Sequence, residues 1–394
     1  MRFVIVSIML IAVGNVGALA GGGSSSGNGG GMKPNVYFSG SVMDEATGDY
    51  RGAYWANGRR VDFPLQSVAS DIDVTDGHVY VAGTALLHGK NLPVYWLDGV
   101  LQVLPNADEI TFIRASRAIG GHYYLVSSRA GEGLVSATLW IDGKDVPLAI
   151  PPSMRGAYGR SIDVDSDGHV YVAGMVFESR DVKNYHPGYW FDGVWVALPE
   201  PGPAPNYVSG IQVKDGHVYV SAVKQGMAAG YWLDGVWNDL ITTRSASSLT
   251  VSPLSVSDGH VWAAATLYFQ SDVLHIMPGL WKDGIWSDLP LPQNMTDGQV
   301  SSIFTSSDGH FVAGGSVCGW NSKNERTCLP GYWFDGNWKS FPNSIEGGVF
   351  SMAVEWVEDQ TKPIHGGIEN EDASLGAFIR DDDRVRGDGR RRNP

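Results

Sequence analysis

Basic side chains are scarce in this sequence. Its 394 residues include 28 Lys and Arg against 42 Asp and Glu, which gives a formal net charge of −14. Five of the arginines lie in the last eleven residues, so the rest of the chain is more acidic still. Nucleic-acid binding needs Lys and Arg to neutralise phosphates. The composition therefore argues against nucleic acid as the main ligand.

Long hydrophobic runs are confined to the N-terminus. Arg2 is followed by the apolar run Phe3–Val13 and by a small-residue site at 18–20. This order is typical of a cleaved signal peptide over residues 1–20, and it is too short for a membrane anchor. No cysteine follows the cleavage site, so a lipoprotein anchor is not supported. We expect a secreted or periplasmic protein without a transmembrane anchor.

Cysteine is nearly absent as well. Cys318 and Cys328 are the two in the chain, and they lie in one stretch without a neighbouring histidine. In a secreted protein this arrangement favours a disulfide over a metal site.

Recognisable catalytic spacing is also lacking. No acid–base pair or nucleophile set follows a known motif. The run from Asp163 to Gly168 opens like a calcium loop, but Gly174 stands where the bidentate Glu would fall, which favours a polar hairpin. We expect no metal and no cofactor. A site assembled from separate parts of the chain would be invisible at this level, so enzymatic activity is left open.

What the chain does contain is a repeated aromatic unit. Its clearest copy is Gly188-Tyr189-Trp190-Phe191-Asp192-Gly193-Val194-Trp195. Eight copies place Trp, or Phe in the last, at 55, 96, 140, 190, 232, 281, 333 and 378. A period of roughly 40–50 residues indicates a propeller, a solenoid or a similar array.

A second motif alternates with the first. Its clearest copy is Asp167-Gly168-His169-Val170-Tyr171-Val172-Ala173-Gly174. Its histidines could suggest a ring of metal ligands, but a residue that recurs with the repeat is better explained by a role in the hairpin. These histidines are His78, His122, His169, His217, His260 and His310.

Both motifs predict hairpins. Asp-Gly between two β-rich runs favours a type I′ turn, which needs positive φ at both central residues. Two hairpins per repeat make four short strands, which is one blade of a β-propeller. We therefore predict an all-β fold of four-stranded antiparallel blades, most simply eight, with seven as the alternative. Strands from both chain ends could complete one blade.

Four segments follow from this pattern. Residues 1–20 form the signal peptide, 21–34 a Gly/Ser-rich linker, 35–383 the repeat domain, and 384–394 a basic, disordered tail. The tail contains Arg386-Gly387-Asp388, an integrin-type tripeptide that arises easily by chance in such a composition.

The blade geometry suggests a working face. If the Asp-Gly turns are the first and third connections of each blade, they share one face of the disc. The longer, variable connections then share the other face, and binding residues concentrate on such loops. Candidate binding residues there are Tyr185, His186, Tyr268 and His275.

The order aromatic-x-Asp-Gly, Leu-Pro, then Ile-x-Val-x-Asp-Gly-x-Val resembles bacterial extracellular propeller repeats, most loosely the HAF-type repeats. The resemblance covers nearly the whole chain, implies a secreted propeller and supplies no catalytic residue.

Three functional hypotheses remain at this stage. The first is a secreted or periplasmic scaffold that binds a protein or a carbohydrate. The second is a propeller enzyme of glycosidase or lyase type, with its site at the mouth of the central axis. The third is a structural surface protein without a small ligand. The sequence does not indicate an oligomeric state.

Overall fold

The structure is a computed structural model that describes residues 32–358, except 44–46, 48, 106–107, 109–110, 131–134, 180–184, 203–205, 225–227, 271–273, 321–325 and 342–346. The predicted signal peptide, the basic tail and the eighth repeat around 363–378 lie outside the described residues. The first strand begins at Met32, so it starts inside the segment expected to be a linker.

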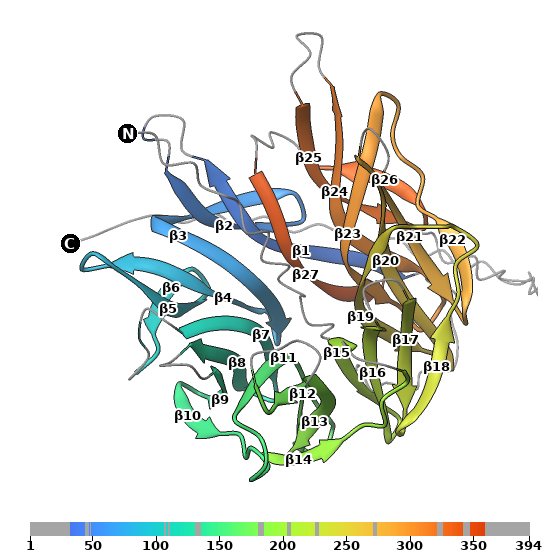
Figure 1. Ribbon diagram of the computed structural model, residues 1–394. Coiled ribbons are helices and arrows are strands. Elements are labelled where there is room, and N and C mark those ends of the chain that lie inside the picture. Colours follow the sequence, from blue (N-terminus) through green and yellow to red (C-terminus); the bar gives the residue numbers. More distant parts are fainter. Residues whose placement is uncertain are drawn as a thin grey trace, which may run out of the picture.

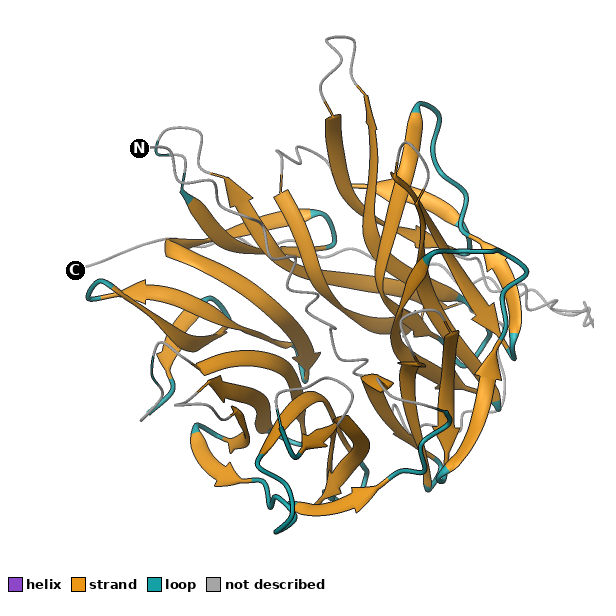
Figure 2. Cartoon of the chain, viewed as in Figure 1, coloured by secondary structure: helices purple, strands orange, loops and turns teal. Residues whose placement is uncertain are grey.

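The regular secondary structure of the described residues consists of strands, joined by turns and loops (Figure 2). In chain order they are β1 (Met32–Met43), β2 (Tyr50–Ala56), β3 (Arg59–Thr75), β4 (His78–Leu87), β5 (Lys90–Leu97), β6 (Val100–Val103), β7 (Thr111–Ile119), β8 (His122–Ala130), β9 (Val135–Ile141), β10 (Lys144–Pro147), β11 (Gly156–Val164), β12 (Val170–Phe177), β13 (Tyr185–Phe191), β14 (Val194–Ala197), β15 (Asn206–Lys214), β16 (His217–Lys224), β17 (Ala228–Leu233), β18 (Val236–Leu240), β19 (Ser248–Ser257), β20 (His260–Gln270), β21 (Leu274–Lys282), β22 (Ile285–Asp288), β23 (Met295–Thr305), β24 (Phe311–Trp320), β25 (Arg326–Phe334), β26 (Asn337–Ser340) and β27 (Gly347–Glu358).

These strands form seven blades arranged around an axis (Figure 1). Five blades are separate four-stranded sheets, and a seven-stranded sheet supplies two more because the long strand β3 serves both. We number the blades from 1 (β27, β1, β2 and the first half of β3) and 2 (the second half of β3 to β6) up to 7 (β23–β26). The described residues thus form a seven-bladed β-propeller, the alternative that the sequence left open.

The ring is closed by strands from both ends of the chain. β27 pairs antiparallel with β1 from Met32↔Glu358 to Val42↔Gly347, and Figure 1 shows the two strands side by side. β27 thereby becomes the innermost strand of blade 1. Strands from both chain ends thus complete one blade, an arrangement that the sequence had left open.

The hydrophobic core lies between the blades. Seven clusters of buried side chains each join neighbouring blades; one of them joins Phe63 and Ala353 of blade 1 to Trp96 of blade 2. Both faces of each sheet are buried in this way, which is why Tyr and Trp stand side by side along the strands.

The repeated Gly-Tyr-Trp-x-Asp-Gly-x-Trp pattern has a packing cause. A Cβ added at Gly279 would lie 2.1 Å from Cζ2 of Trp286, which lies over it from the outermost strand. The same contact recurs at Gly188, Gly230 and Gly331. Blade 2 has Val94 in the glycine position and Leu101 in the tryptophan position. The small residue is therefore needed where the tryptophan is present.

The Asp-Gly turns are the first and third connections of the blades, as predicted. Positive φ at both residues, as at Asp98 (50°) and Gly99 (81°), gives the expected I′ geometry. Blades 4 and 7 differ at the first turn, because the longer turn 165–169 and its counterpart 306–310 need positive φ at glycine alone. We call the face with these turns the turn face and the opposite one the loop-rich face.

The connections expected as long loops on the loop-rich face are mostly extended strands. β24 and β25 continue past the core, so that Cys318 and Cys328 stand opposite each other in the ladder. They form the predicted disulfide, with Cα atoms 4.1 Å apart. In this part of the chain the loop-rich face is a rim of projecting hairpins.

Candidate binding site

The repeated histidines join the two hairpins of a blade. The Nδ1 atom of His217 lies 2.6 Å from Oδ2 of Asp234, and the backbone N–H of Val218 donates to Oδ1 of the same carboxylate at 2.9 Å. Five other blades repeat this contact, with Nδ1–Oδ2 distances of 2.6–2.8 Å. In blade 1 Asn57 accepts from Val36 and donates to Asn35. These contacts support the structural role predicted for the histidines. Each histidine pairs with the aspartate of the second Asp-Gly turn in its own blade.

The turn that resembles a calcium loop is also a hairpin. Oδ1 of Asp165 accepts from the backbone N–H groups of Asp167 and His169, and the Tyr171 hydroxyl donates to Oδ2. Among the residues that the structure describes, no group of three or more His, Cys, Asp or Glu is arranged to hold a metal.

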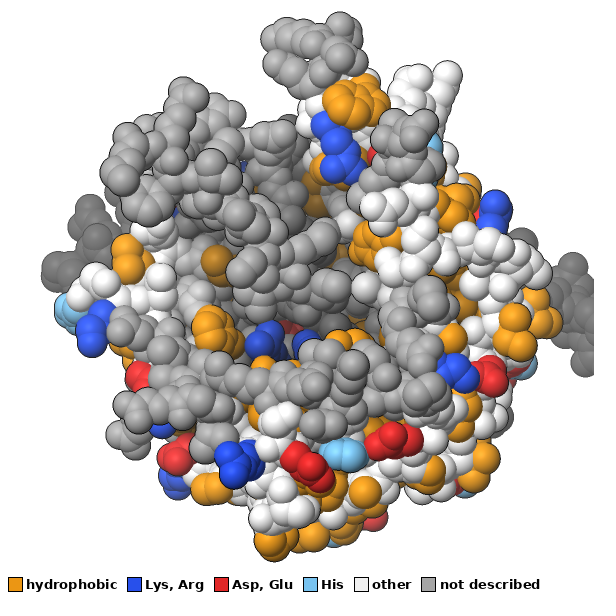
Figure 3. Space-filling model, in the orientation of Figure 1, with side chains coloured by type: hydrophobic (Ala, Val, Ile, Leu, Met, Phe, Trp, Pro, Cys, Tyr) orange, Lys and Arg blue, Asp and Glu red, His pale blue; other side chains and the backbone are white. Residues whose placement is uncertain are grey.

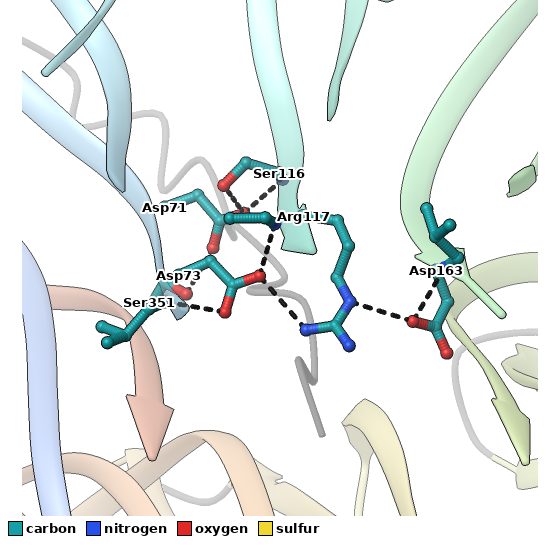
Figure 4. A network of polar contacts seen from close by, with 9 residues as sticks. Asp71, Asp73, Ser116, Arg117, Asp163 and Ser351 are labelled. Atoms are coloured by element: carbon teal, nitrogen blue, oxygen red, sulfur yellow. Dashed lines mark hydrogen bonds and ion pairs between the residues drawn. The ribbon is translucent and has the colours of Figure 1, made fainter. Parts of the chain in front are cut away.

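A buried charged network lies on the innermost strands (Figure 4). Arg117 of β7 contacts Oδ2 of Asp73 through Nη1 and Oδ1 of Asp163 through Nε, both at 3.2 Å. Asp71 accepts hydrogen bonds from Ser116 and from Ser351 of the closing strand. The network therefore links blades 1 to 4.

Hydrogen bonds to backbone amides continue this network around the axis, and we call the whole ring of contacts the axial belt. In each case a side chain of one innermost strand accepts from a backbone N–H of the next blade: Asp73 from Ala118, Asp163 from Val213, Gln212 from Val256 and Ser255 from Thr305, at 2.6–3.0 Å. These bonds fix neighbouring blades at the axis.

Burial dominates the electrostatics of this belt. It raises the pKa of Asp71 to about 7, although hydrogen bonds from Ser351 and Ser116 oppose the shift. It raises the pKa of Asp163 to about 6 against the opposing charge of Arg117. Burial alone would lower the pKa of Arg117, but the two neighbouring carboxylates outweigh it and raise that pKa. The guanidinium is thus the charged centre of the axis.

A second ring lies on the same strands, nearer the loop-rich face. Every innermost strand carries a β-bulge at the equivalent position, where its register shifts. The extra residues at these bulges are Ser70, Arg114, Arg160, Ser209, Ser252 with Pro253, Ser301 and Phe350. Bulges re-aim side chains and are common beside functional sites. Two neighbouring blades, 3 and 4, place arginine where most others place serine.

The two bulge arginines form a basic pair. Burial and, after it, the nearby Arg160 guanidinium lower the pKa of Arg114 to about 10. The Nε atoms of both are buried and find no hydrogen-bond partner within the described residues. Figure 3 shows Lys or Arg side chains at the base of a hollow at the centre of the ring of blades. Arg114 and Arg160 lie on innermost strands, and both are partly exposed.

Aromatic side chains surround this pair. The Cζ atom of Arg114 lies 5.9 Å from the ring centroid of Phe112, and that of Arg160 lies 6.0 Å from the ring centroid of Tyr158. Phe112 is 40 % exposed. Tyr158 in turn contacts Tyr185 edge-on, with centroids 5.9 Å apart.

The predicted binding residues fall in two separate blades. In blade 4 Tyr185 is buried within this aromatic cluster, and Nδ1 of the neighbouring His186 lies 2.9 Å from Glu200. In blade 6 Tyr268 is half-buried and His275 is exposed, on the paired strands β20 and β21. Of the four residues, the structure places Tyr185 beside the bulge arginines, through its contact with Tyr158.

Sequence reasoning missed Arg114 and Arg160. The signal was present, because both stand three residues before the belt position, at 117 and 163, in adjacent repeats. Seeing it required the innermost strands to be aligned on the turns that follow them.

No helix of the described residues is long and apolar enough to cross a membrane. The disulfide is compatible with an extracellular or periplasmic location.

Comparisons with known proteins assign no family to this chain. No protein-family model matches the chain, and no curated protein matches it in sequence, so the likeness to HAF-type repeats stays a prediction. Matching structures include the acylaminoacyl peptidase of Pyrococcus horikoshii, with 12% identity over 80% of this chain and 52% of that chain and a TM-score of 0.48. TolB from Acinetobacter baumannii matches with 12% identity over 81% of this chain and 66% of that chain and a TM-score of 0.40. Trypanosoma rangeli sialidase matches with 12% identity over 74% of this chain and 58% of that chain and a TM-score of 0.41. The chain spans between about half and two thirds of each of these proteins.

Proposed function

We propose that this β-propeller is a secreted or periplasmic scaffold that binds a protein or a glycan on its loop-rich face. Tyr185, His186, Tyr268 and His275 remain proposed contacts on that face. A relation to the HAF-type extracellular repeats is part of the same proposal.

The contrast between the axis and the rim carries this proposal. The carboxylates of the axial belt are inaccessible, since Asp71 and Asp163 are 0 % and 4 % exposed and are occupied by hydrogen bonds or by Arg117. A hydrolase would need carboxylates that a substrate can reach. The loop-rich rim instead exposes an aromatic side chain, Trp320, at 54 %. Exposed aromatics are favoured anchors for binding.

Trp320 is the better probe of the rim. It ends β24, two residues after Cys318, so the disulfide holds its strand in place. A rigid hairpin that carries an exposed indole loses little conformational entropy on binding.

The test is binding of the full chain to an array of defined glycans and to a panel of purified envelope proteins. Trp320→Ala should weaken binding at least roughly tenfold, the loss expected for an interface anchor. Val236→Ala, an exposed residue beside a turn-face hairpin, should leave binding unchanged. Equal losses in both variants would contradict the assignment of the face. Turnover of a bound glycan would replace the scaffold with the enzyme hypothesis.

A further inference from the structure

We propose that the bulge pair Arg114 and Arg160 forms a binding site for a saccharide that carries a carboxylate. This inference rests on the proposed scaffold function and names the class of ligand that the scaffold would bind at its axis.

The first observation is a departure from the repeat. The seven innermost strands share one bulge, and most of them place serine at it, yet blades 3 and 4 place arginine. A residue required by the blade would recur with the blade, as the turn histidines do. Two arginines confined to neighbouring blades therefore need a cause outside the repeat.

The second observation is electrostatic. Two guanidinium groups lie near each other, largely buried, with unbonded Nε atoms and no ion pair among the residues described. By contrast Arg117, on the same strand as Arg114, is flanked by two carboxylates. Neighbouring buried like charges destabilise the fold unless an anion compensates them. A carboxylate suits a pair of guanidinium groups, because each can donate two parallel hydrogen bonds.

The third observation selects a saccharide over other anions. Phe112 and Tyr158 lie beside the two guanidinium groups, and the partly exposed Ser70 occupies the bulge of blade 2, next to blade 3. Aromatic faces pack against the apolar face of a sugar ring, and serine hydroxyls can both donate to and accept from its hydroxyl groups. An extended acidic peptide would use few of these groups in a hollow at the axis.

Calorimetric titration of the full chain tests the proposal with four probes: tetragalacturonate, the neutral tetragalactose of equal length, a tetraglutamate peptide and sodium sulfate. We expect tetragalacturonate to bind at least tenfold more tightly than each of the others. Tighter binding of tetraglutamate would assign the site to acidic peptides. Equal binding of sulfate would indicate an adventitious ion only, and equal binding of the neutral sugar would remove the role of the carboxylate.

Arg160→Gln separates a ligand site from a structural one. It should weaken tetragalacturonate binding roughly tenfold or more, as expected for a lost charged hydrogen bond. It should also leave the melting temperature unchanged or raise it, since a like-charge repulsion is removed. Lys214→Gln, at the turn-face end of β15, should change neither. A lower melting temperature with unchanged binding would overturn the proposal.

Together, the Trp320 and Arg160 variants distinguish the scaffold proposal from the carboxylate-site proposal. Glycan binding that depends on Trp320 but not on Arg160 would keep the scaffold and reject the carboxylate site. An absence of binding to every glycan and protein probe would reject both.

Discussion

The contact between His217 and Asp234 shows how single residues serve the fold on the turn face. Burial pushes the pKa of Asp234 upward, but the backbone N–H of Val218 and the ring of His217 outweigh it, so the pKa is lowered. The same balance lowers the pKa of Asp98, Asp142 and Asp283. A lowered pKa means stability that is complete above the unfolded value, about 4, and is lost as pH falls through the folded value.

Asp234→Asn should therefore lower the stability at pH 7 by less than about 1 kcal/mol, because the site is exposed and Asn57 does the same work in blade 1. It should remove part of the loss of stability below about pH 4. Thermal melts from pH 3 to 7 measure both effects. Asp215→Asn, in the first turn of the same blade, serves as the control and should melt like the wild type throughout.

The pKa of Asp71, on the axis, is shifted in the opposite direction. Its pKa is raised to about 7, so between about pH 4 and 7 the folded state keeps a proton that the unfolded state has released. Stability should fall across this range by up to about 4 kcal/mol. In Asp71→Asn this part of the slope should disappear, as urea unfolding at pH 5 and 8 would show. The matched variant Asp76→Asn, on an exposed turn, should keep the wild-type slope; loss of slope in both would contradict the assignment.

Blades 4 to 7 depend on a fit between a glycine and a tryptophan of their two outer strands. Gly279→Ala should cost roughly 1–3 kcal/mol, because the new Cβ meets the Trp286 ring. In a Trp286→Leu background, which imitates blade 2, the same change should cost clearly less. A double-mutant cycle by chemical denaturation measures this coupling. Additive losses would show that the ring is not what excludes the side chain.

The blades could be predicted from the sequence, whereas the side-chain contacts at the axis could not. Asp-Gly turns act within a few residues, so the hairpins, their shared face and the Cys318–Cys328 pairing follow from local chemistry. Arg117 meets Asp73 and Asp163 from more than forty residues away, and only the packing of blades 2, 3 and 4 around the axis brings them together. The blade count was ambiguous for the same reason, since a worn eighth repeat near residue 378 suggests a blade that the pairing of β27 with β1 does not need.

The ring as a whole is completed by a single strand. Deleting residues 347–358 should abolish cooperative unfolding, because blade 1 loses its innermost strand and the Ser351 contact to Asp71. A chain of residues 32–358 should instead melt as the full chain does, since it holds all seven blades. Calorimetry compares the three proteins. A strongly lowered melting temperature for 32–358 would show that residues after 358 belong to the fold.

Ring closure by β27 also sets the order in which the protein can be made. Asn35 and Glu355 are hydrogen-bonded across 320 residues of sequence, so β1 emerges from the ribosome long before its partner. Until then the edge of β1 is an open template for pairing with other chains. Folding that depends on such distant contacts is slow. A chain interrupted before Glu358 would therefore be prone to aggregate, and the cell must keep the nascent propeller apart from its copies until its last strand arrives.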